Sequence, residues 1–170
     1  EAGGARIQAR ATGWINRVRS MIVFMCDASY VCAPQNVDRA TLEGATLTAD
    51  AATGETTLRA SLTLQSPTDD ATGNLLPRRA RTYGSLSALH RIGPVLVSAE
   101  LSASSKRYDD AANMRAMAGY AIVNLYAEWA AGRGVTLFVR GDNVLDRDYE
   151  LAADYSTGGA QVFAGVRWTM

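Results

Sequence analysis

The final segment of the chain, Gln161 to Met170, alternates between apolar and polar side chains, and this period of two is the strongest constraint on the fold. One parity carries Val162, Ala164, Val166, Trp168 and Met170. The other parity carries Gln161, Gly165, Arg167 and Thr169, with Phe163 as its apolar exception. Successive side chains of a β-strand point to opposite faces of the sheet. The segment therefore predicts a strand with one apolar face and one polar face.

The same alternation recurs along the whole chain, which predicts about eight strands. The earlier segments are 6–16, 45–50, 57–65, 81–88, 95–104, 120–129 and 135–142. Most of them approach the roughly 10 residues that a tilted strand needs to cross a membrane. Charged residues in these segments and in the final one take the polar parity, among them Arg6, Arg10, Arg59, Glu100, Glu128, Arg140 and Arg167.

Short and long connections alternate between these segments. The short ones are AATGE, RIGP and AAGRG, whereas the long, polar ones are 25–36, 67–78, 106–115 and 146–160. Outer-membrane barrels show this asymmetry, with turns at one end and loops at the other. Trp129 and Trp168 lie at strand ends beside short turns, as in an aromatic belt at the headgroup level. We therefore predict an all-β, antiparallel transmembrane β-meander; a soluble β-sandwich is the alternative.

Composition excludes several classes of function. The 17 basic and 17 acidic residues balance, so bulk electrostatics predict no nucleic-acid partner. No apolar run approaches the roughly 20 residues of a membrane-spanning helix. His90 is the only histidine, and we find no catalytic triad or Cys/His pair, so we predict no enzyme and no metal site. With neither an initiator Met nor a signal peptide, Glu1 is expected to begin a processed chain or a fragment.

Two cysteines lie in the stretch CDASYVC. Cys26 and Cys32 are either two buried thiols or a local disulfide that staples a loop. We favour the disulfide, which requires an oxidising compartment. No histidine or further cysteine lies nearby to complete a zinc site.

The long connections contain the candidate ligand-binding residues. Asp109, Asp110 and Asn113 offer oxygen ligands for calcium, but we interpret them as part of a solvated external loop. Asp142, Asp146 and Asp148 are explained by turn chemistry. Amphipathic tyrosine rings in these connections are suited to contact an incoming ligand. The full candidate set is Tyr108, Asp109, Asp110, Asn113, Tyr149 and Tyr155.

Arg78, Arg79 and Arg81 form the densest basic patch of the sequence. We interpret this patch as charge in the lumen or at the rim of a barrel. Contact with acidic lipopolysaccharide is the alternative.

Two motifs resemble TonB-dependent outer-membrane receptors. GDNVLDRDYE (141–150) resembles the family's Asn-Leu-Phe-Asp-Lys/Arg-Asp-Tyr stretch after the penultimate strand, with Val144 as a departure. Gly165-x-x-Trp168-x-Met170 resembles the assembly signal Gly-x-x-aromatic-x-aromatic, with Met in the last place.

Within that family, longer stretches are most similar to the cobalamin (vitamin B12) receptor. They are 16–24, 36–44, 75–86, 106–125 and 146–159. A visible departure is Gly158-Gly159-Ala160, where the family usually has Pro-Gly-Arg.

The resemblance implies that residues 1–170 are the C-terminal part of an outer-membrane barrel of about 22 strands. An N-terminal plug, absent from this sequence, would fill the barrel and offer a TonB box to the energy-transducing complex. As a fragment, the chain is expected to form a curved open sheet with two unpaired edges. A closed barrel that pairs 161–170 with the first strand would contradict this expectation.

The function so implied is cobalamin import across the bacterial outer membrane. A ferric-siderophore receptor of the same class is one alternative, and a complete eight-stranded barrel with a structural or adhesive role is another. The expected partners are outer-membrane lipid, lipopolysaccharide, the TonB complex, the barrel assembly machinery and the small-molecule ligand. No cofactor is assigned, because the family's calcium-binding aspartates lie in earlier loops.

Overall fold

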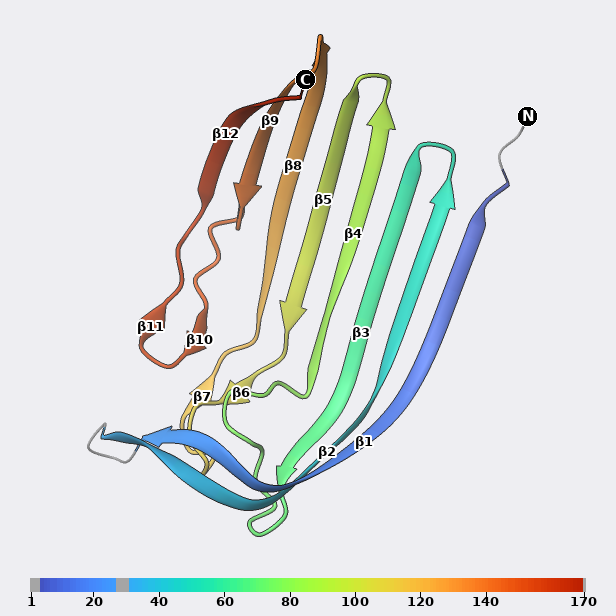
Figure 1. Cartoon of the computed structure of the whole chain (residues 1–170). Coiled ribbons are helices and arrows are strands. Elements are labelled where there is room, and N and C mark those ends of the chain that lie inside the picture. The colour runs from blue at the N-terminus through green and yellow to red at the C-terminus, as the bar shows by residue number, and fades with distance from the viewer. Residues whose placement is uncertain (1–3, 27–30, 170) are drawn as a thin grey trace.

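A computed structural model describes residues 4–26 and 31–169, and its main element is one antiparallel eight-stranded sheet (Figure 1). The strands of this sheet are β1 (Arg6–Cys26), β2 (Cys32–Thr53), β3 (Thr56–Asp69), β4 (Thr82–Ile92), β5 (Val95–Ser104), β8 (Tyr120–Gly132), β9 (Val135–Asp142) and β12 (Gln161–Trp168). Two small hairpins pair β6 (Arg107–Tyr108) with β7 (Ala116–Met117) and β10 (Glu150–Ala152) with β11 (Tyr155–Ser156). No helix in the described ranges is long and apolar enough to span a membrane.

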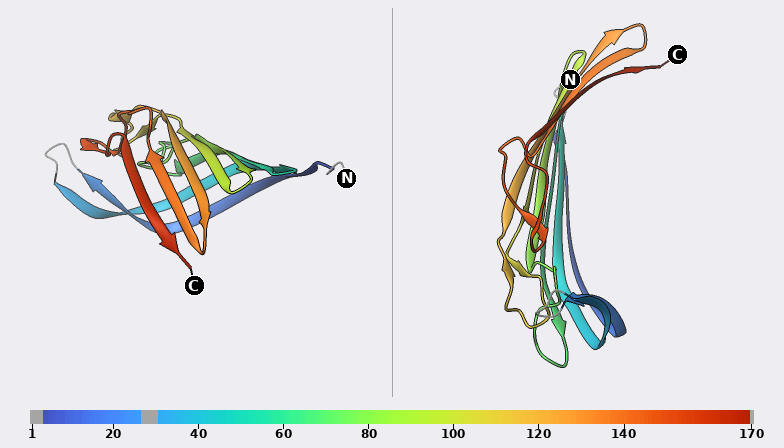
Figure 2. Two further views of the ribbon diagram at one scale, coloured as in Figure 1. Left: turned by 90° about the horizontal axis from the view of Figure 1, so that it is seen from above. Right: turned by 90° about the vertical axis from the view of Figure 1, so that its left-hand side faces the viewer.

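The sheet is open and curved, as predicted. Its strand order follows the chain from β1 to β12, and these two strands lie at opposite edges. The view from above and the side view show a bent wall that does not close on itself (Figure 2). The closed eight-stranded barrel is therefore not the architecture of this chain.

Tight turns and long connections separate to the two ends of the sheet, as the sequence predicts (Figure 1). The turns β2–β3, β4–β5 and β8–β9 lie at one end, which we call the turn end. Gly54 and Gly93 occupy positive φ angles of 53° and 56° there, a conformation that glycine adopts readily in two-residue hairpins. We call the opposite end, where the long connections lie, the loop end.

The register of the sheet places apolar side chains beside one another on a single face. Leu47 pairs with Leu62, and Leu101 with both Leu86 and Val123. We call this the apolar face and the opposite side the polar face. The side chains of the apolar face are uncovered in this chain; Trp168, for example, is 64% exposed. Trp129 and Trp168 lie near the turn end, whereas Met170 lies outside the described residues.

The predicted loop 25–36 is wrong. β1 and β2 continue as a hairpin to Cys26 and Cys32, with lengths of 21 and 22 residues. Membrane strands need only about 9–11 residues. The expected polarity already ends at Asn16, because Arg17 takes the parity of the apolar side chains. Ser20, with a φ of 53°, then interrupts the regular alternation, so the sequence did not reveal the rest of the strand.

We call the part of the β1–β2 hairpin beyond the predicted strands, 17–26 and 32–44, the β1–β2 extension. The polarity of the two sides of the sheet reverses in this extension. On the side of the apolar face, β1 and β2 now carry Arg17, Arg19, Arg39, Thr41 and Glu43. The other side carries Ala40 and Leu42, which form a small core with Leu76 from the β3–β4 connection. Trp14, Val18 and Met21 pack against this core. The extension therefore has a water-facing exterior, unlike the rest of the wall.

Cys26 and Cys32 lie directly opposite each other in the β1–β2 register. Residues directly opposite each other in antiparallel strands have Cα atoms about 4.5–5.5 Å apart, which is within the range that a disulfide spans. The side chain of Cys26 lies outside the described residues, so the disulfide stays a prediction.

We expect maleimide labelling of the exported, full-length protein to fail without reductant and to reach both cysteines after reduction. The reason is that only a free thiolate reacts. A Cys26→Ser variant is the control, because it leaves Cys32 free to label. Labelling of both wild-type cysteines without reductant would rule out the disulfide.

Gly165 is required for packing on the polar face, whatever its role in assembly. The Phe138 ring lies over it, and a Cβ at Gly165 would approach the ring Cζ to 2.5 Å. The ring also stacks on Tyr126, with centroids 6.3 Å apart, and lies 6.0 Å from the Arg167 guanidinium. Any side chain at position 165 must displace this ring.

Gly165→Val is therefore expected to destabilise the barrel by about 1–3 kcal/mol, the usual cost of overpacking. Urea unfolding of the full-length protein in lipid vesicles measures this change. Ala164→Val, whose side chain lies on the apolar face, is the matched control. Equal midpoints for Gly165→Val and the wild type would contradict this packing.

Candidate functional site

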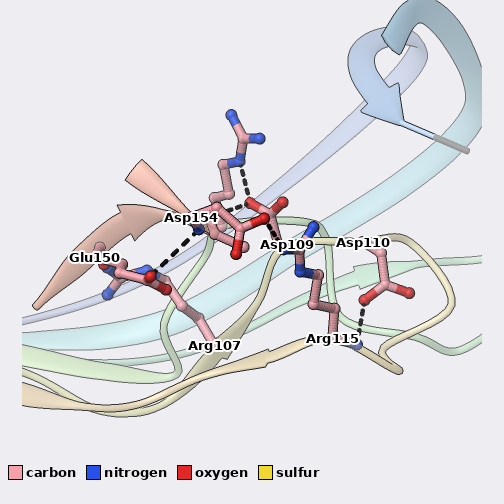
Figure 3. Close-up of polar contacts among 8 residues, drawn as sticks. Arg107, Asp109, Asp110, Arg115, Glu150 and Asp154 are labelled. Carbon is pink, nitrogen blue, oxygen red and sulfur yellow. Dashed lines mark hydrogen bonds and ion pairs between the residues drawn. The ribbon is translucent and has the colours of Figure 1, made fainter. Parts of the chain in front are cut away.

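Three connections at the loop end are bonded to one another through Asp109 (Figure 3). They are residues 70–81, 105–119 and 143–160. Arg78 Nε donates to Asp109 Oδ1 at 2.6 Å, which joins the first connection to the second. The backbone N–H of Ala153 donates to the same oxygen at 3.3 Å, which joins the third. One carboxylate thus links all three connections.

The ion pair with Arg78 favours the ionised form of Asp109. Its side chain is only 9% exposed. Burial alone would raise its pKa, but hydrogen bonds from Arg78 and the Ala153 N–H, with the charges of Arg78 and Arg115, hold the pKa below its ordinary value. The negative charge that the network needs is therefore present at neutral pH.

Further bonds tie the same connections together. Asn113 clamps the backbone of Leu75, accepting from its N–H at 2.8 Å and donating to its carbonyl at 2.9 Å. Arg115 forms an ion pair with Asp154, and Arg107 donates to the Glu150 carbonyl. The three connections are therefore a single bonded unit, which we call the loop network.

The loop network uses most of the residues predicted to contact a ligand. Asp109 and Asn113 bond neighbouring connections, and Asp110 accepts from the backbone N–H groups of Met114 and Arg115. Tyr108 is half-buried, and its carbonyl accepts from the Arg78 N–H.

The two remaining tyrosines differ in exposure. The Tyr149 ring packs against Tyr120 at a tilt of 35°, with ring centroids 4.5 Å apart. Tyr155 is 74% exposed. Ligand contact by any of the six residues stays a prediction. Within the described ranges, no group of three or more His, Cys, Asp or Glu side chains is placed to hold a metal.

The motif GDNVLDRDYE builds the turn by which the chain leaves β9. Asn143 is buried at a φ of 48° and bonds the backbone of Arg147 through both side-chain atoms, each at 2.9 Å. Asp146 accepts from the Ala160 N–H at 2.8 Å. Such left-handed Asn and Asp residues are typical of turns.

A cavity of about 520 Å³ lies on the polar face beside the loop network. Its polar and aromatic lining comprises Arg78, Arg79, Arg107, Gln65, Tyr83, Tyr120, Ser61, Ser85, Ser102 and Ser104. We call it the basic pocket. From the sequence, the basic patch that contains Arg78 and Arg79 was interpreted as charge in the lumen or at the rim of a barrel. Arg107 was not included in that interpretation, because it comes from a different connection. Contact of the patch with lipopolysaccharide stays a prediction.

An open sheet with one continuous apolar face and a polar face under long loops defines a wall of a membrane β-barrel. Residues 2–144 match the family "TonB dependent receptor-like, beta-barrel". The chain belongs to the TonB-dependent receptor family and lies in the bacterial outer membrane. Its exposed apolar face is therefore lipid-facing, and its polar face lines the barrel interior.

Solved structures share this fold. Copper transporter OprC is 20% identical with a TM-score of 0.76, and the match covers 96% of this chain and 28% of OprC. The siderophore receptor PiuA from Acinetobacter baumannii is 18% identical with a TM-score of 0.77, over 95% of this chain and 26% of its own. The ferric yersiniabactin uptake receptor FyuA from Yersinia pestis is 18% identical with a TM-score of 0.72, and the match covers 94% of this chain and 27% of FyuA.

The chain thus spans little more than a quarter of each of these receptors. At such identities the likeness establishes the fold and leaves the cargo open. No curated protein matches the sequence.

A second concavity, of about 580 Å³, lies on the lipid-facing side. Small residues of neighbouring strands, among them Ala88, Ala99 and Ala127, line it. Because lipid chains cover this face in a membrane, we place the candidate ligand site at the basic pocket instead.

Proposed function

We propose that this chain forms part of the wall of an outer-membrane receptor that captures a small molecule at the loop end and imports it with energy supplied through TonB. The observation that supports this function is the loop network. It fixes three long connections in place beside a polar pocket on the interior face. A pre-organised rim lowers the entropic cost of ligand capture.

Cobalamin is the first cargo that we propose, because the sequence stretches quoted above resemble the cobalamin receptor. A ferric siderophore is the second candidate, since PiuA and FyuA are described as receptors for such chelates. The remaining proposed partners are a plug domain with its TonB box, lipopolysaccharide around the wall, and the barrel assembly machinery. The last would read the signal at Gly165 and Trp168.

Uptake by the full-length protein tests this proposal. The gene is expressed in a bacterial host that lacks its own cobalamin and siderophore receptors, with and without TonB. Radiolabelled cyanocobalamin and radioiron chelates are supplied separately. We expect accumulation of one cargo only when TonB is present. No accumulation of any cargo, or accumulation that does not depend on TonB, would contradict the proposal.

A further inference from the structure

Three arginines lie together on the outer side of the β1–β2 extension, the side that continues the apolar face. Arg17, Arg19 and Arg39 are all exposed there. Arg19 and Arg39 are directly opposite each other in the register, and Arg17 comes two residues before Arg19 on the same side of β1. Like charges directly opposite each other destabilise a pair of strands. An anion bound between the two arginines would remove this repulsion.

The three arginines have no ion-pair partner among residues 4–26 and 31–169. Two carboxylates are close to them in the register. Glu43 lies lower on the outer side of β2, opposite Ile15, and the backbone N–H of Asp70 donates to the Arg39 carbonyl at 3.1 Å. Neither carboxylate forms an ion pair with the arginines in this part of the chain. Their positive charge is therefore available to an anion from outside the chain.

The position of the arginines along β1 places them at the edge of the hydrocarbon. The outer side of β1 is apolar from Ile7 to Ile15, and Ile15 is 53% exposed. This stretch has the roughly 9–11 residues that a tilted strand needs to cross the hydrocarbon. With a rise of about 3.3 Å per residue and a tilt of about 45°, Arg17 and Arg19 lie about 5 and 9 Å above Ile15 along the membrane normal. They are therefore at the level of the lipid headgroups.

The arginines face the outer leaflet of the membrane. They lie at the loop end, where the long connections also lie (Figure 1). In outer-membrane barrels the long connections are on the extracellular side. The lipid at that level is lipopolysaccharide, which carries phosphate groups next to its acyl chains.

We propose that Arg17, Arg19 and Arg39 bind the phosphate groups of a lipopolysaccharide molecule whose acyl chains lie on the apolar face of β1 and β2. A guanidinium group binds phosphate oxygens through two parallel hydrogen bonds, and a phosphate between Arg19 and Arg39 removes their repulsion. The site is separate from the basic patch at 78–81, because Arg78 and Arg79 line a pocket on the interior face. It gives lipopolysaccharide, proposed above only as the surroundings of the wall, a defined place on this chain.

Titration of the full-length receptor with lipid A in non-ionic detergent, followed by native mass spectrometry, tests the inference. The probes are bisphosphorylated lipid A, lipid A without phosphate groups, and inorganic phosphate. We expect the double variant Arg19→Glu, Arg39→Glu to bind bisphosphorylated lipid A about ten- to a hundredfold more weakly than the wild type, because repulsive charges replace attractive ones. Arg133→Glu, an exposed substitution in the β8–β9 turn at the turn end, is the matched control and should bind like the wild type.

A neutral double variant shows whether the loss comes from binding and not from misfolding. Arg19→Gln with Arg39→Gln removes the like-charge repulsion, so in detergent alone it should unfold at a temperature no lower than the wild type does. Added bisphosphorylated lipid A should raise the unfolding temperature of the wild type, because a ligand that binds only the folded state stabilises it. The neutral variant should show a clearly smaller rise.

Three outcomes would overturn the inference. The first is equal binding of bisphosphorylated lipid A by the wild type and the Glu double variant. The second is equal binding of lipid A with and without phosphate groups by the wild type. The third is displacement of lipid A by millimolar inorganic phosphate, which would indicate a site for a free anion and not for a lipid. TonB-dependent uptake is measured separately, so this inference can fail while the proposed receptor function stands.

Discussion

Replacing Ala99 by arginine in the full-length receptor is expected to cost about 2–4 kcal/mol of folding free energy in a bilayer. Ala99 lies midway along β5 on the apolar face, where its cross-strand neighbours are Ala88 and Leu125. An arginine there would face hydrocarbon, which offers no hydrogen-bond partner and little room for the side chain to reach water. Urea unfolding in phosphatidylcholine vesicles measures the change.

The adjacent residue provides the control for that experiment. Ser98 points to the polar face and pairs with Leu89 and Tyr126. Ser98→Arg is expected to shift the stability by less than about 1 kcal/mol, since water is available on the interior side. Equal destabilisation by both arginines would mean that β5 does not separate lipid from water.

Removing the Asp109 carboxylate is expected to release the loop network. Asp109→Ala leaves Arg78 and the Ala153 N–H without their shared acceptor. Because Arg78 is 41% exposed on its side chain, water replaces part of the lost bond. We therefore expect a local cost of about 1–3 kcal/mol rather than the larger cost of a fully buried pair.

Hydrogen exchange reports this opening segment by segment. Amides in 70–81, 105–119 and 143–160 should exchange faster in Asp109→Ala, while those of β4 and β5 should not change. Asp70→Ala, an exposed substitution in the first of these connections, is the matched control. Unchanged protection in all three segments would contradict the role assigned to Asp109.

The same network has a predictable response to acid. A carboxyl group whose pKa is lowered on folding stabilises the structure at pH values above its unfolded pKa. That contribution is lost as the pH falls through the lower, folded value. The pKa of Asp109 is held below its ordinary value, so the network should stay closed as the pH falls through the range in which an ordinary aspartate is protonated, and it should open only in stronger acid. Opening of the wild-type network with a midpoint above pH 5 would contradict this assignment. It would also be contradicted if the network of Asp109→Asn opened with the same pH profile as the wild type.

Alternation in the sequence predicts the wall of the barrel correctly because each strand exposes one side to lipid and the other to a wet interior. That pattern is local, so it is visible in any segment such as 95–104 or 135–142. It fails after Asn16, where Arg17 takes the apolar parity and the left-handed Ser20 then interrupts the strand geometry. It also fails in the β1–β2 extension, where water replaces lipid and the polarity of the two sides reverses.

The candidate site was harder to predict because its bonds join residues far apart in sequence. Arg78 and Asp109 lie 31 positions apart, and Arg107 and Glu150 lie 43 apart. Nothing in the composition of the separate connections indicates these pairings. The acidic residues were predicted to contact a ligand, but several of them form hydrogen bonds within the protein itself. Arg107 was not singled out in the sequence, yet it is the charged residue that lies buried beside the pocket.

The central claim is that one side of this sheet faces lipid and the other faces the receptor interior. Single cysteines placed along β5 from Val97 to Leu101 in the full-length receptor, with Cys26 and Cys32 replaced by serine, test it most directly. An environment-sensitive fluorophore on each cysteine is read in native outer membranes. We predict emission that alternates with period two, with a lipid-like signal at 97, 99 and 101 and quenching by aqueous iodide at 98 and 100. Uniform iodide quenching along β5 would contradict the account.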